Sequence, residues 1–275
     1  MTLSPREARE LLERHNLAPR RAFGQNFVVD PNTVRRIARL ANVGPGDRVV
    51  EIGPGLGSLT RALVETGASV TAVEIDHGLC AVLRIELASL DVHLVEGDAL
   101  KLDWPSVLGD STGWTMVANL PYNVATPLVC DLLDDVPQIS RMLVMVQREV
   151  GDRMVAAAGT DAYGAVSVKL AYWGEAKIAG YVPPTVFLPQ PKVDSALVSI
   201  TRWPTPAVPD VDRVLLFSLV RAGFGQRRKM LRRSLSALVP AEAFAQAGIR
   251  PEARAEELDV QQWGALARAV AGLQA

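Results

Sequence analysis

Residues 49–57 read Val49-Val50-Glu51-Ile52-Gly53-Pro54-Gly55-Leu56-Gly57, an apolar run that passes into a glycine-rich turn. The run predicts a strand, and the turn predicts the entry into a helix over 58–66. Glycine lets the backbone bend sharply and lets a ligand lie against it. The spacing departs from the dinucleotide fingerprint, because Ser58 occupies its third glycine position and Pro54 removes one N–H that a pyrophosphate would use. A glycine loop alone therefore predicts a nucleotide-type ligand without specifying which one.

Strands and helices alternate on the carboxyl side of this loop. Strands are predicted at 48–52, 69–75, 92–95, 115–118 and 141–146, with helices at 58–66, 77–89 and 126–134. Such alternation implies right-handed crossovers and a parallel sheet. Two further strands, at 178–182 and 195–200, are expected to complete the sheet as a pair. The predicted fold is α/β with a Rossmann-like sheet.

Two helices are predicted before the sheet. Ser4-Pro5-Arg6-Glu7 is a capping box with proline at the first helical position, so a helix is expected from there to Arg14. Asp30-Pro31 starts a second helix, whose apolar face is Val34, Ile37, Ala38 and Ala41. A loop joins the two helices.

A proline-rich stretch marks a domain boundary at Trp203-Pro204-Thr205-Pro206-Ala207-Val208-Pro209, since alternating prolines resist both helix and central strand. The predicted domains are 1–201, a linker at 202–209, and a small all-helical domain at 210–275. Its helices are expected at 211–221, 227–238, 241–247 and 261–273.

Acidic residues follow the strands at the edge where the glycine loop lies. Glu74 ends the second strand, where a carboxylate accepts both hydroxyls of a ribose, and Asp98 follows the third strand, in reach of an adenine amine. Glu51 and Asp76 add negative charge. Anionic surroundings oppose phosphates and favour a cation, so the expected cofactor is S-adenosylmethionine, a nucleoside with a sulfonium and no phosphate.

Asn119-Leu120-Pro121-Tyr122 follows the fourth strand, whose carboxyl end is expected at the same edge. Asn119 offers a side-chain acceptor, and Leu120 and Pro121 offer backbone carbonyls. Tyr122 offers a flat face. The stretch therefore suits a planar ring that bears an amine, gripped by its N–H groups.

Composition limits the class of protein. The 275 residues are 49% hydrophobic with a net charge of −1, so no polyanion partner is indicated for the molecule as a whole. The unpaired spacing of Cys80 and Cys130 fits a reduced, cytoplasmic protein. The histidines are scattered, so no metal site is expected, and no apolar run predicts a membrane span or a signal peptide.

One basic run stands out within this nearly neutral chain. Six cations without an intervening acid occur within 221–233, namely Arg221, Arg227, Arg228, Lys229, Arg232 and Arg233. In the expected helix over 227–238, Leu231, Leu235 and Leu238 share one face, which places Lys229 and Arg233 opposite, in solvent. The run predicts contact with nucleic-acid phosphates, and Arg14, Arg20 and Arg21 extend the basic surface.

The chain resembles the ribosomal RNA adenine dimethyltransferases, which are class I S-adenosylmethionine-dependent methyltransferases, over nearly its whole length. The motifs that carry the resemblance, in order, are Phe23-Gly24-Gln25-Asn26-Phe27, Glu51-Ile52-Gly53-Pro54-Gly55, Glu74-Ile75-Asp76, Gly97-Asp98-Ala99, Asn119-Leu120-Pro121-Tyr122-Asn123 and Phe187-Leu188-Pro189-Gln190-Pro191-Lys192-Val193-Asp194-Ser195. Phe224-Gly225-Gln226-Arg227-Arg228-Lys229 and Arg254-Ala255-Glu256-Glu257-Leu258 resemble the small-subunit (16S, kasugamycin-resistance) branch more than the macrolide-resistance branch.

The resemblance implies dimethylation of the N6 amine of adenines, two adjacent ones in that branch, within small-subunit ribosomal RNA during ribosome biogenesis. It implies cofactor contacts at Asn26, the Val28 backbone, Gly53, Glu74, Asp98 and Asn119, to which the glycine loop adds Glu51 and Gly55. It places the target adenine between Tyr122 and Phe187. Leucine is commoner than valine at position 28, a change that a backbone contact tolerates. The expected partner is ribosomal RNA or a precursor of the small subunit, and we expect a monomer.

Three other functions fit parts of the sequence. The nearest is macrolide-resistance-type dimethylation of large-subunit (23S) RNA. A non-catalytic RNA-binding assembly or transcription factor on the same fold is the second. A nicotinamide dehydrogenase is the third, and the loop spacing, the Asn119–Tyr122 stretch and the absence of an obvious hydride-transfer partner oppose it.

Overall fold

The computed structural model describes residues 2–20 and 24–274, so the predicted contributions of Arg21 and Phe23 lie outside the described residues. The chain forms two compact units. The sheet unit comprises Met1–Gly151 and Lys177–Thr201, and the helical unit comprises Asp152–Ala176 and Arg202–Ala275. Each unit is described separately below.

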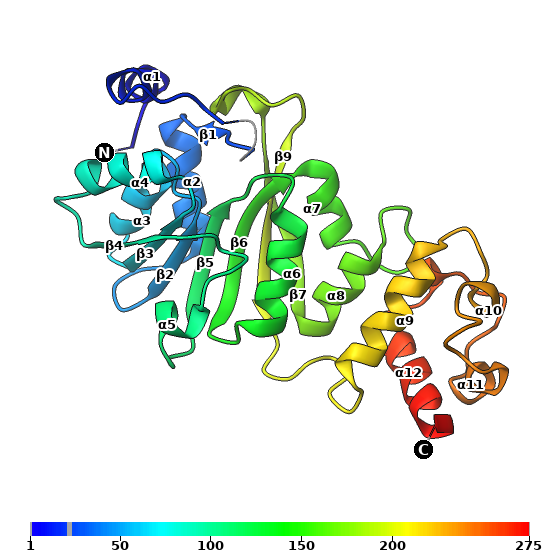
Figure 1. The fold of residues 1–275 in the computed structure, drawn as a ribbon. Coiled ribbons are helices and arrows are strands. Elements are labelled where there is room, and N and C mark those ends of the chain that lie inside the picture. Colours follow the sequence, from blue (N-terminus) through cyan, green and yellow to red (C-terminus); the bar gives the residue numbers. More distant parts are fainter. Residues whose placement is uncertain (1, 21–23, 275) are drawn as a thin grey trace. The chain divides into compact units, whose positions relative to one another are not determined.

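The sheet unit is built on a seven-stranded sheet of order β4-β3-β2-β5-β6-β9-β7 (Figure 1). The strands are β2 (Arg48–Ile52), β3 (Ser69–Glu74), β4 (Val92–Glu96), β5 (Trp114–Asn119), β6 (Ile139–Gln147), β7 (Gly174–Val182) and β9 (Ser195–Arg202). The first five are parallel to their neighbours, and β9 runs antiparallel to β6. The parallel core and the added strands at one edge are confirmed.

Helices cover both faces of this sheet. They are α1 (Pro5–Arg14), α2 (Pro31–Ala41), α3 (Ser58–Val64), α4 (His77–Glu86), α5 (Trp104–Leu108) and α6 (Ala125–Asp135), and α7 (Arg148–Met154) leads into the helical unit. Right-handed crossovers place α3 and α4 on one face and α6 on the other. Because both faces are covered, the side chains of the central strands β2 and β5 are almost all buried.

The predicted helix starts in the sheet unit are confirmed in atomic detail. The Ser4 hydroxyl accepts from the Glu7 N–H while the Glu7 carboxylate accepts from the Ser4 N–H, the reciprocal capping box expected at α1. Asp30 caps α2 by accepting from Thr33 N at 2.8 Å. The apolar face of α1 packs on Leu56, at the glycine loop, and on α4.

A small antiparallel ladder ties the N-terminal loop to the sheet unit. β1 (Phe27–Val28) pairs with β8 (Phe187–Leu188), which follows the 3-10 turn η2 (Pro184–Val186). Both strands fall in segments predicted as loops. They are only two residues long, too short for an alternating pattern to be visible in the sequence.

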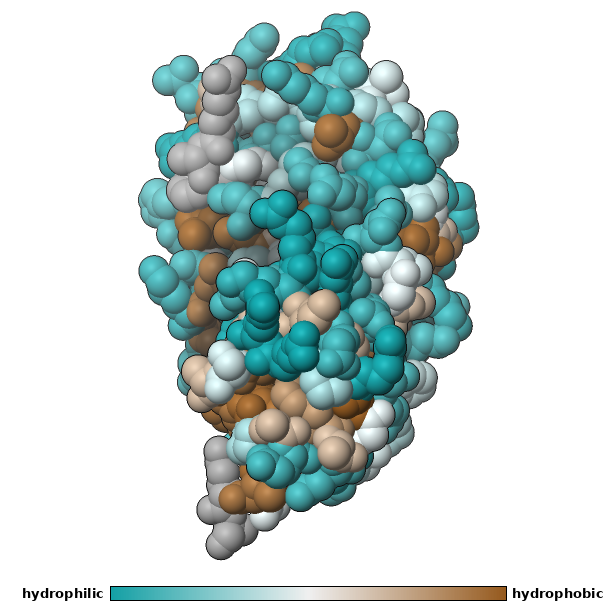
Figure 2. Space-filling view, turned by 90° about the vertical axis from the view of Figure 1, so that its right-hand side faces the viewer, coloured by the Kyte–Doolittle hydropathy of each residue, from teal (hydrophilic) through white to brown (hydrophobic). Residues whose placement is uncertain are grey.

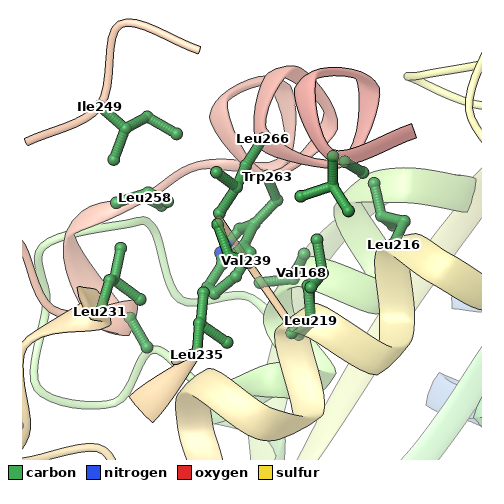
Figure 3. Packing of buried hydrophobic residues seen from close by; sticks show 14 of the residues in the cluster. Val168, Leu216, Leu219, Leu231, Leu235, Val239, Ile249, Leu258, Trp263 and Leu266 are labelled. Carbon is green, nitrogen blue, oxygen red and sulfur yellow. The ribbon is translucent and has the colours of Figure 1, made fainter. Parts of the chain in front are cut away.

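The helical unit contains α8 (Ala165–Trp173), α9 (Arg213–Gly225), α10 (Leu231–Ser234), α11 (Ala241–Gln246), η3 (Ala255–Glu257) and α12 (Val260–Gln274). Its core gathers around the fully buried Trp263, with Val168, Leu219 and Leu235 among the surrounding side chains (Figure 3). A side chain at position 223 would meet the Trp263 ring at 2.7 Å, so the glycine there lets α9 approach α12 closely.

The helical unit begins earlier in the chain than the proline-rich stretch. Tyr163 and Tyr172 belong to its core, so the contacts of 152–176 group this segment with 202–275 and not with the sheet. The proline-rich stretch is itself anchored there, since Ala207 N donates to the Tyr172 carbonyl at 2.8 Å and Val208 is 1% exposed.

The single helix predicted over 227–238 is wrong. α9 continues to Gly225, the chain then turns, and α10 covers only Leu231–Ser234. The N–H groups of Leu231 and Arg232 donate to the carbonyls of Ala253 and Pro251, which replace the missing preceding turn of a helix. Leu238, expected on the buried face, is 40% exposed.

No helix in the described part of the chain is long and apolar enough to cross a membrane.

Candidate active site

A cavity of about 160 Å³ lies at the carboxyl ends of β2, β3, β4 and β5. The strand order reverses between β2 and β5, the position at which open α/β sheets bind ligands. Its walls come from the N-terminal loop (24–27), the glycine loop (Gly53, Gly55), the ends of β3 and β4 (73–75, 97–100) and the segment after β5 (119–124). The cavity therefore brings together segments that lie far apart in the sequence.

The glycine loop needs glycine for two different reasons. Gly53 and Gly55 have φ values of +73° and +59°, in the left-handed region that other residues rarely adopt. A Cβ on Gly55 would also lie 2.7 Å from the Phe27 ring, so the N-terminal loop closes directly onto the glycine loop. Both glycines line the cavity, as predicted for a cofactor-binding loop.

Glu74 forms a fixed acidic wall of the cavity. One carboxyl oxygen accepts from Gly55 N at 3.2 Å and the other from Asp76 N at 2.9 Å, which locks the side-chain orientation. Burial raises the pKa of Glu74, and these backbone N–H groups oppose the shift. A carboxylate held in this way suits the two hydroxyls of a ribose.

Asp76 serves the architecture and not the cavity. It caps α4 by accepting from Gly78 N, accepts from the Gln25 amide at 3.0 Å, and pairs with Arg20 at 3.4 Å. Gln25 and Arg20 belong to the N-terminal loop, so Asp76 ties that loop to the end of β3.

Asp98 lines the far end of the cavity beside two apolar side chains that the sequence analysis missed. Its carboxylate accepts from Leu100 N at 3.0 Å and lies 3.6 Å from the Lys101 ammonium. Ile75 and Leu100 line the same cavity and are 47% and 43% exposed. The sequence signal that could have identified them is an apolar residue one or two positions after each acid, Ile75 after Glu74 and Leu100 after Asp98.

The amide of Asn119 has a defined orientation. Its Nδ2 donates to the Asn26 carbonyl at 2.8 Å, and Asn26 in turn donates to the Gly24 carbonyl at 3.0 Å. The Asn119 side-chain oxygen therefore stays available as an acceptor at the cavity it lines.

The backbone carbonyls expected to help Asn119 behave differently from one another. The Pro121 carbonyl accepts from Val124 N and Ala125 N, both at 3.1 Å, as the chain enters α6. Its expected role as an acceptor for substrate is therefore not supported. Within the described residues, the structure records no hydrogen-bond donor for the Leu120 carbonyl, although the Leu120 side chain is buried.

Tyr122 lines the cavity and is held by its hydroxyl, which lies 3.0 Å from Ser195 Oγ at the start of β9. Burial raises the pKa of this phenol.

Phe187 does not line the cavity beside Tyr122. Its side chain is 4% exposed and packs in the core with α2 and α3. Its pairing with Val28 in the β1–β8 ladder holds it there, so the expectation that it flanks the target ring is not met.

Glu51 and Val28 do not line the main cavity. They line a smaller cavity, and Gly53, Gly55 and Asn119 line both cavities. Glu51 is 1% exposed, and burial raises its pKa to about 8, with a further contribution from the nearby Glu74. One of its carboxyl oxygens has no hydrogen-bond partner. A direct cofactor contact by Glu51 through the main cavity is therefore not supported.

The predicted RNA-binding residues lie at the end of α9 and around α10. Arg227 pairs with Glu256 at 3.0 Å and donates to the Asp161 carbonyl, and Arg232 pairs with Glu252 at 3.3 Å, so both hold the helical unit together. The remaining four cations are exposed, and the described residues include no acidic partner for them: Arg221, Arg228, Lys229 and Arg233. Figure 2 views the side on which Figure 1 draws α10 and shows hydrophilic residues gathered in the middle of that face.

Residues 2–20 and 24–274 contain no group of three or more side chains of the metal-binding types His, Cys, Asp and Glu placed to hold a metal ion.

Comparisons with known proteins identify the family of this chain. A model of the family "Ribosomal RNA adenine dimethylase" matches residues 16–271. Relatives named "Ribosomal RNA small subunit methyltransferase A" from Cutibacterium acnes and Bifidobacterium adolescentis are 48% and 45% identical; each match covers 98% of this chain and 94% of the relative.

Solved structures agree on the fold. A dimethyladenosine transferase from Plasmodium falciparum has a TM-score of 0.73 at 23% identity, covering 86% of this chain and 94% of that one. The 23S rRNA methyltransferase ErmE has a TM-score of 0.66 at 26% identity, covering 89% and 99%. The predicted class I methyltransferase fold is confirmed, and the chain belongs to the ribosomal RNA adenine dimethylase family.

Proposed function

We propose that this protein transfers two methyl groups from S-adenosylmethionine to the N6 amine of adenines in small-subunit ribosomal RNA, during assembly of that subunit. Near-full-length relatives with 45% and 48% identity carry a small-subunit methyltransferase name, which favours this substrate over the large-subunit one. The observation that carries the chemistry is the hydrogen bond from Asn119 to Asn26, which fixes an amide oxygen as an acceptor at the cavity.

The cavity fits S-adenosylmethionine. Glu74 is oriented for the ribose hydroxyls, Asp98 for the adenine amine, and Ile75 and Leu100 for the two faces of that ring. The acids disfavour a phosphate-bearing cofactor and favour a cationic one. When bound, S-adenosylmethionine supplies an electrophilic methyl group on a sulfonium.

The protein activates the target amine by accepting hydrogen bonds from its N–H groups. The lone pair of an adenine amine is delocalised into the ring, so the nitrogen is a weak nucleophile. The Asn119 side-chain oxygen and the Leu120 carbonyl accept the N–H groups, which favours a pyramidal nitrogen and directs its lone pair toward the methyl group. The transfer itself needs positioning and electrostatics. As the N–C bond forms and the bond from the methyl group to sulfur breaks, the nitrogen becomes positively charged and strongly acidic, so it releases its proton to water without a side-chain general base.

Tyr122 replaces the stacking that the adenine loses when it leaves the RNA. The hydrogen bond between Tyr122 and Ser195 holds the ring at the cavity before the RNA arrives. Without Phe187, Tyr122 supplies the aromatic face alone.

The helical unit supplies electrostatic attraction for RNA. Arg221, Arg228, Lys229 and Arg233 are exposed cations, which suit phosphate contacts that do not depend on sequence. A monomer acting on a small-subunit precursor fits this role. Neither Cys80 nor Cys130 is in a disulfide, which is consistent with the proposed location in the reducing cytoplasm.

One experiment tests the function directly. Labelled S-adenosylmethionine is offered with unmodified small-subunit and large-subunit particles, and reverse-transcription stops locate the product, since dimethylation blocks base pairing. The proposal expects label and stops in small-subunit RNA. Stops only in large-subunit RNA identify the macrolide-resistance type, and cofactor binding absent by calorimetry favours a non-catalytic factor.

A further inference from the structure

A second row of side chains continues from Tyr122 along the carboxyl edge of the sheet. The Tyr122 hydroxyl contacts Ser195, and Asp194 is the residue before it. The Asp194 backbone carbonyl accepts from Arg148 N at 2.9 Å, and its carboxylate pairs with the Arg148 guanidinium at 3.6 Å. The same guanidinium lies over the Tyr181 ring, 4.7 Å from its centroid. These contacts connect the base-stacking residue to an arginine–tyrosine pair.

This pair is held in place yet exposed. The Arg148 side chain is 55% exposed, and Tyr181 is 44% exposed, one of the large apolar or aromatic residues that the fold leaves at the surface. Arg36 donates to the Tyr181 carbonyl at 3.0 Å. Its guanidinium lies 2.0 Å from where a Cβ at position 180 would stand, so a side chain there would displace the guanidinium. The backbone that carries the ring is therefore anchored from α2.

The charge around the pair is positive. Arg36 and Arg148 contribute two guanidinium groups, and Lys192, two residues before Asp194, is exposed. The Asp194 carboxylate pairs with Arg148. Glu149 is adjacent in sequence, but neighbouring residues of a helix do not face the same direction. An exposed aromatic ring beside guanidinium groups is the combination with which proteins hold single-stranded nucleic acid.

We propose that Tyr181 and Arg148 bind a nucleotide flanking the target adenine, with the base stacked on the Tyr181 ring and a phosphate against Arg148. This inference rests on the proposed function, because it assumes that an RNA strand enters at Tyr122. It adds an RNA contact on the sheet unit to the one proposed for the helical unit.

The sheet geometry supports this assignment. Arg148 directly follows β6, the neighbour of the strand that ends in Asn119, and Tyr181 lies on β7, beyond β9. With strands about 4.8 Å apart, Arg148 and Tyr181 lie roughly 5 Å and 14 Å along the edge from the target site. A few nucleotides of unstacked RNA span such distances. A base flipped toward Tyr122 leaves its neighbours unstacked, and an exposed aromatic ring compensates for that loss.

A purely structural role makes a different prediction. If Arg148 and Tyr181 only brace the ends of β6 and β7, removing either side chain lowers the melting temperature without affecting RNA recognition. The sheet provides a matched control, since Arg48 lies over the Trp114 ring at 5.2 Å, at the amino ends of β2 and β5. Arg48→Gln removes the same kind of contact from the edge away from the cavity.

The test measures steady-state methylation of unmodified small ribosomal subunits by full-length Tyr181→Leu, Tyr181→Phe, Arg148→Gln and Arg48→Gln. S-adenosylmethionine affinity and melting temperature are recorded for each variant. We expect Tyr181→Leu and Arg148→Gln to raise KM for the particle about 10-fold, as loss of one stacked base or one phosphate contact predicts. Their cofactor affinity stays unchanged, and Tyr181→Phe and Arg48→Gln match the wild type.

Two results overturn the inference while leaving the proposed function intact. One is a wild-type KM for Tyr181→Leu and Arg148→Gln. The other is equal impairment of Tyr181→Leu and Tyr181→Phe, which shows that the hydroxyl and not the ring matters. If the wild-type protein itself neither binds S-adenosylmethionine nor methylates the particle, the proposed function fails first, and the inference falls with it.

Discussion

Replacing Glu51 by glutamine should stabilise the protein, by an amount that depends on pH. Burial raises the folded-state pKa of Glu51 from 4.5 to about 8. Folding therefore takes up a proton at any pH between these values, and this group's contribution to stability falls as the pH rises through that window. Below pH 4.5 the penalty vanishes, and above about pH 8 it is constant.

The size of the effect follows from the shift. One pH unit inside the window changes the free energy of unfolding by about 1.4 kcal/mol. Two and a half units, from 4.5 to pH 7, give a penalty of about 3 kcal/mol that Glu51→Gln removes. Glutamine has nearly the same shape but no titrating proton, and the cost of burying its amide is independent of pH.

Urea unfolding of the cofactor-free wild type and Glu51→Gln at pH 5.5, 6.5 and 7.5 measures this difference. All other titrating groups are common to both proteins, so the change in the difference with pH isolates Glu51. Glu13→Gln, on the exposed face of α1, controls for the loss of one carboxylate from the net charge. A stability difference that stays constant over this range would refute the conclusion that Glu51 is protonated in the folded state.

Three further variants test the cavity and the RNA-binding residues. Asn119→Ala should lower the rate of methyl transfer about 100-fold or more, because the oriented acceptor is lost, with S-adenosylmethionine affinity nearly unchanged; near-normal turnover would contradict this. Gly55→Ala should weaken cofactor binding in calorimetry, since a positive φ costs about 1–2 kcal/mol and the new Cβ meets Phe27; wild-type affinity would argue against that closure. Arg228→Ala/Arg233→Ala should weaken RNA binding and make its salt dependence shallower by about two released counterions, whereas Arg250→Ala, whose guanidinium pairs with Glu257, should not; an unchanged slope would remove these residues from the interface.

The sheet unit was predictable because its signals are local. β2 and β5 are apolar runs bounded by turns. The Ser4 capping box marks the start of α1, and Gly57 precedes the start of α3. The acids and the Asn119 stretch fall at strand ends, so the topology alone predicts that they meet at one edge. The cavity confirms that Glu74, Asp98 and Asn119 do so.

The incorrect predictions have long-range causes. The stretch 227–238 has a helical pattern, but backbone carbonyls of 251–253 hold Leu231 and Arg232 in a different conformation, and no local pattern reports a partner twenty residues away. Phe187 is buried by a ladder with Val28, about 160 residues earlier in the chain. The Arg227–Glu256 pair likewise forms only in the folded chain, so the basic run overstated the number of cations available to RNA.

The identity of the methylated nucleoside tests the central claim most directly. Unmodified small ribosomal subunits are incubated with excess S-adenosylmethionine and the wild-type protein, and the nucleosides are then analysed by mass. Oriented hydrogen bonding of the amine at Asn119 predicts N6,N6-dimethyladenosine in the wild-type reaction and about 100-fold less of it with Asn119→Ala over the same initial period. Monomethyladenosine as the final product, or equal dimethylation by both proteins, would contradict the account.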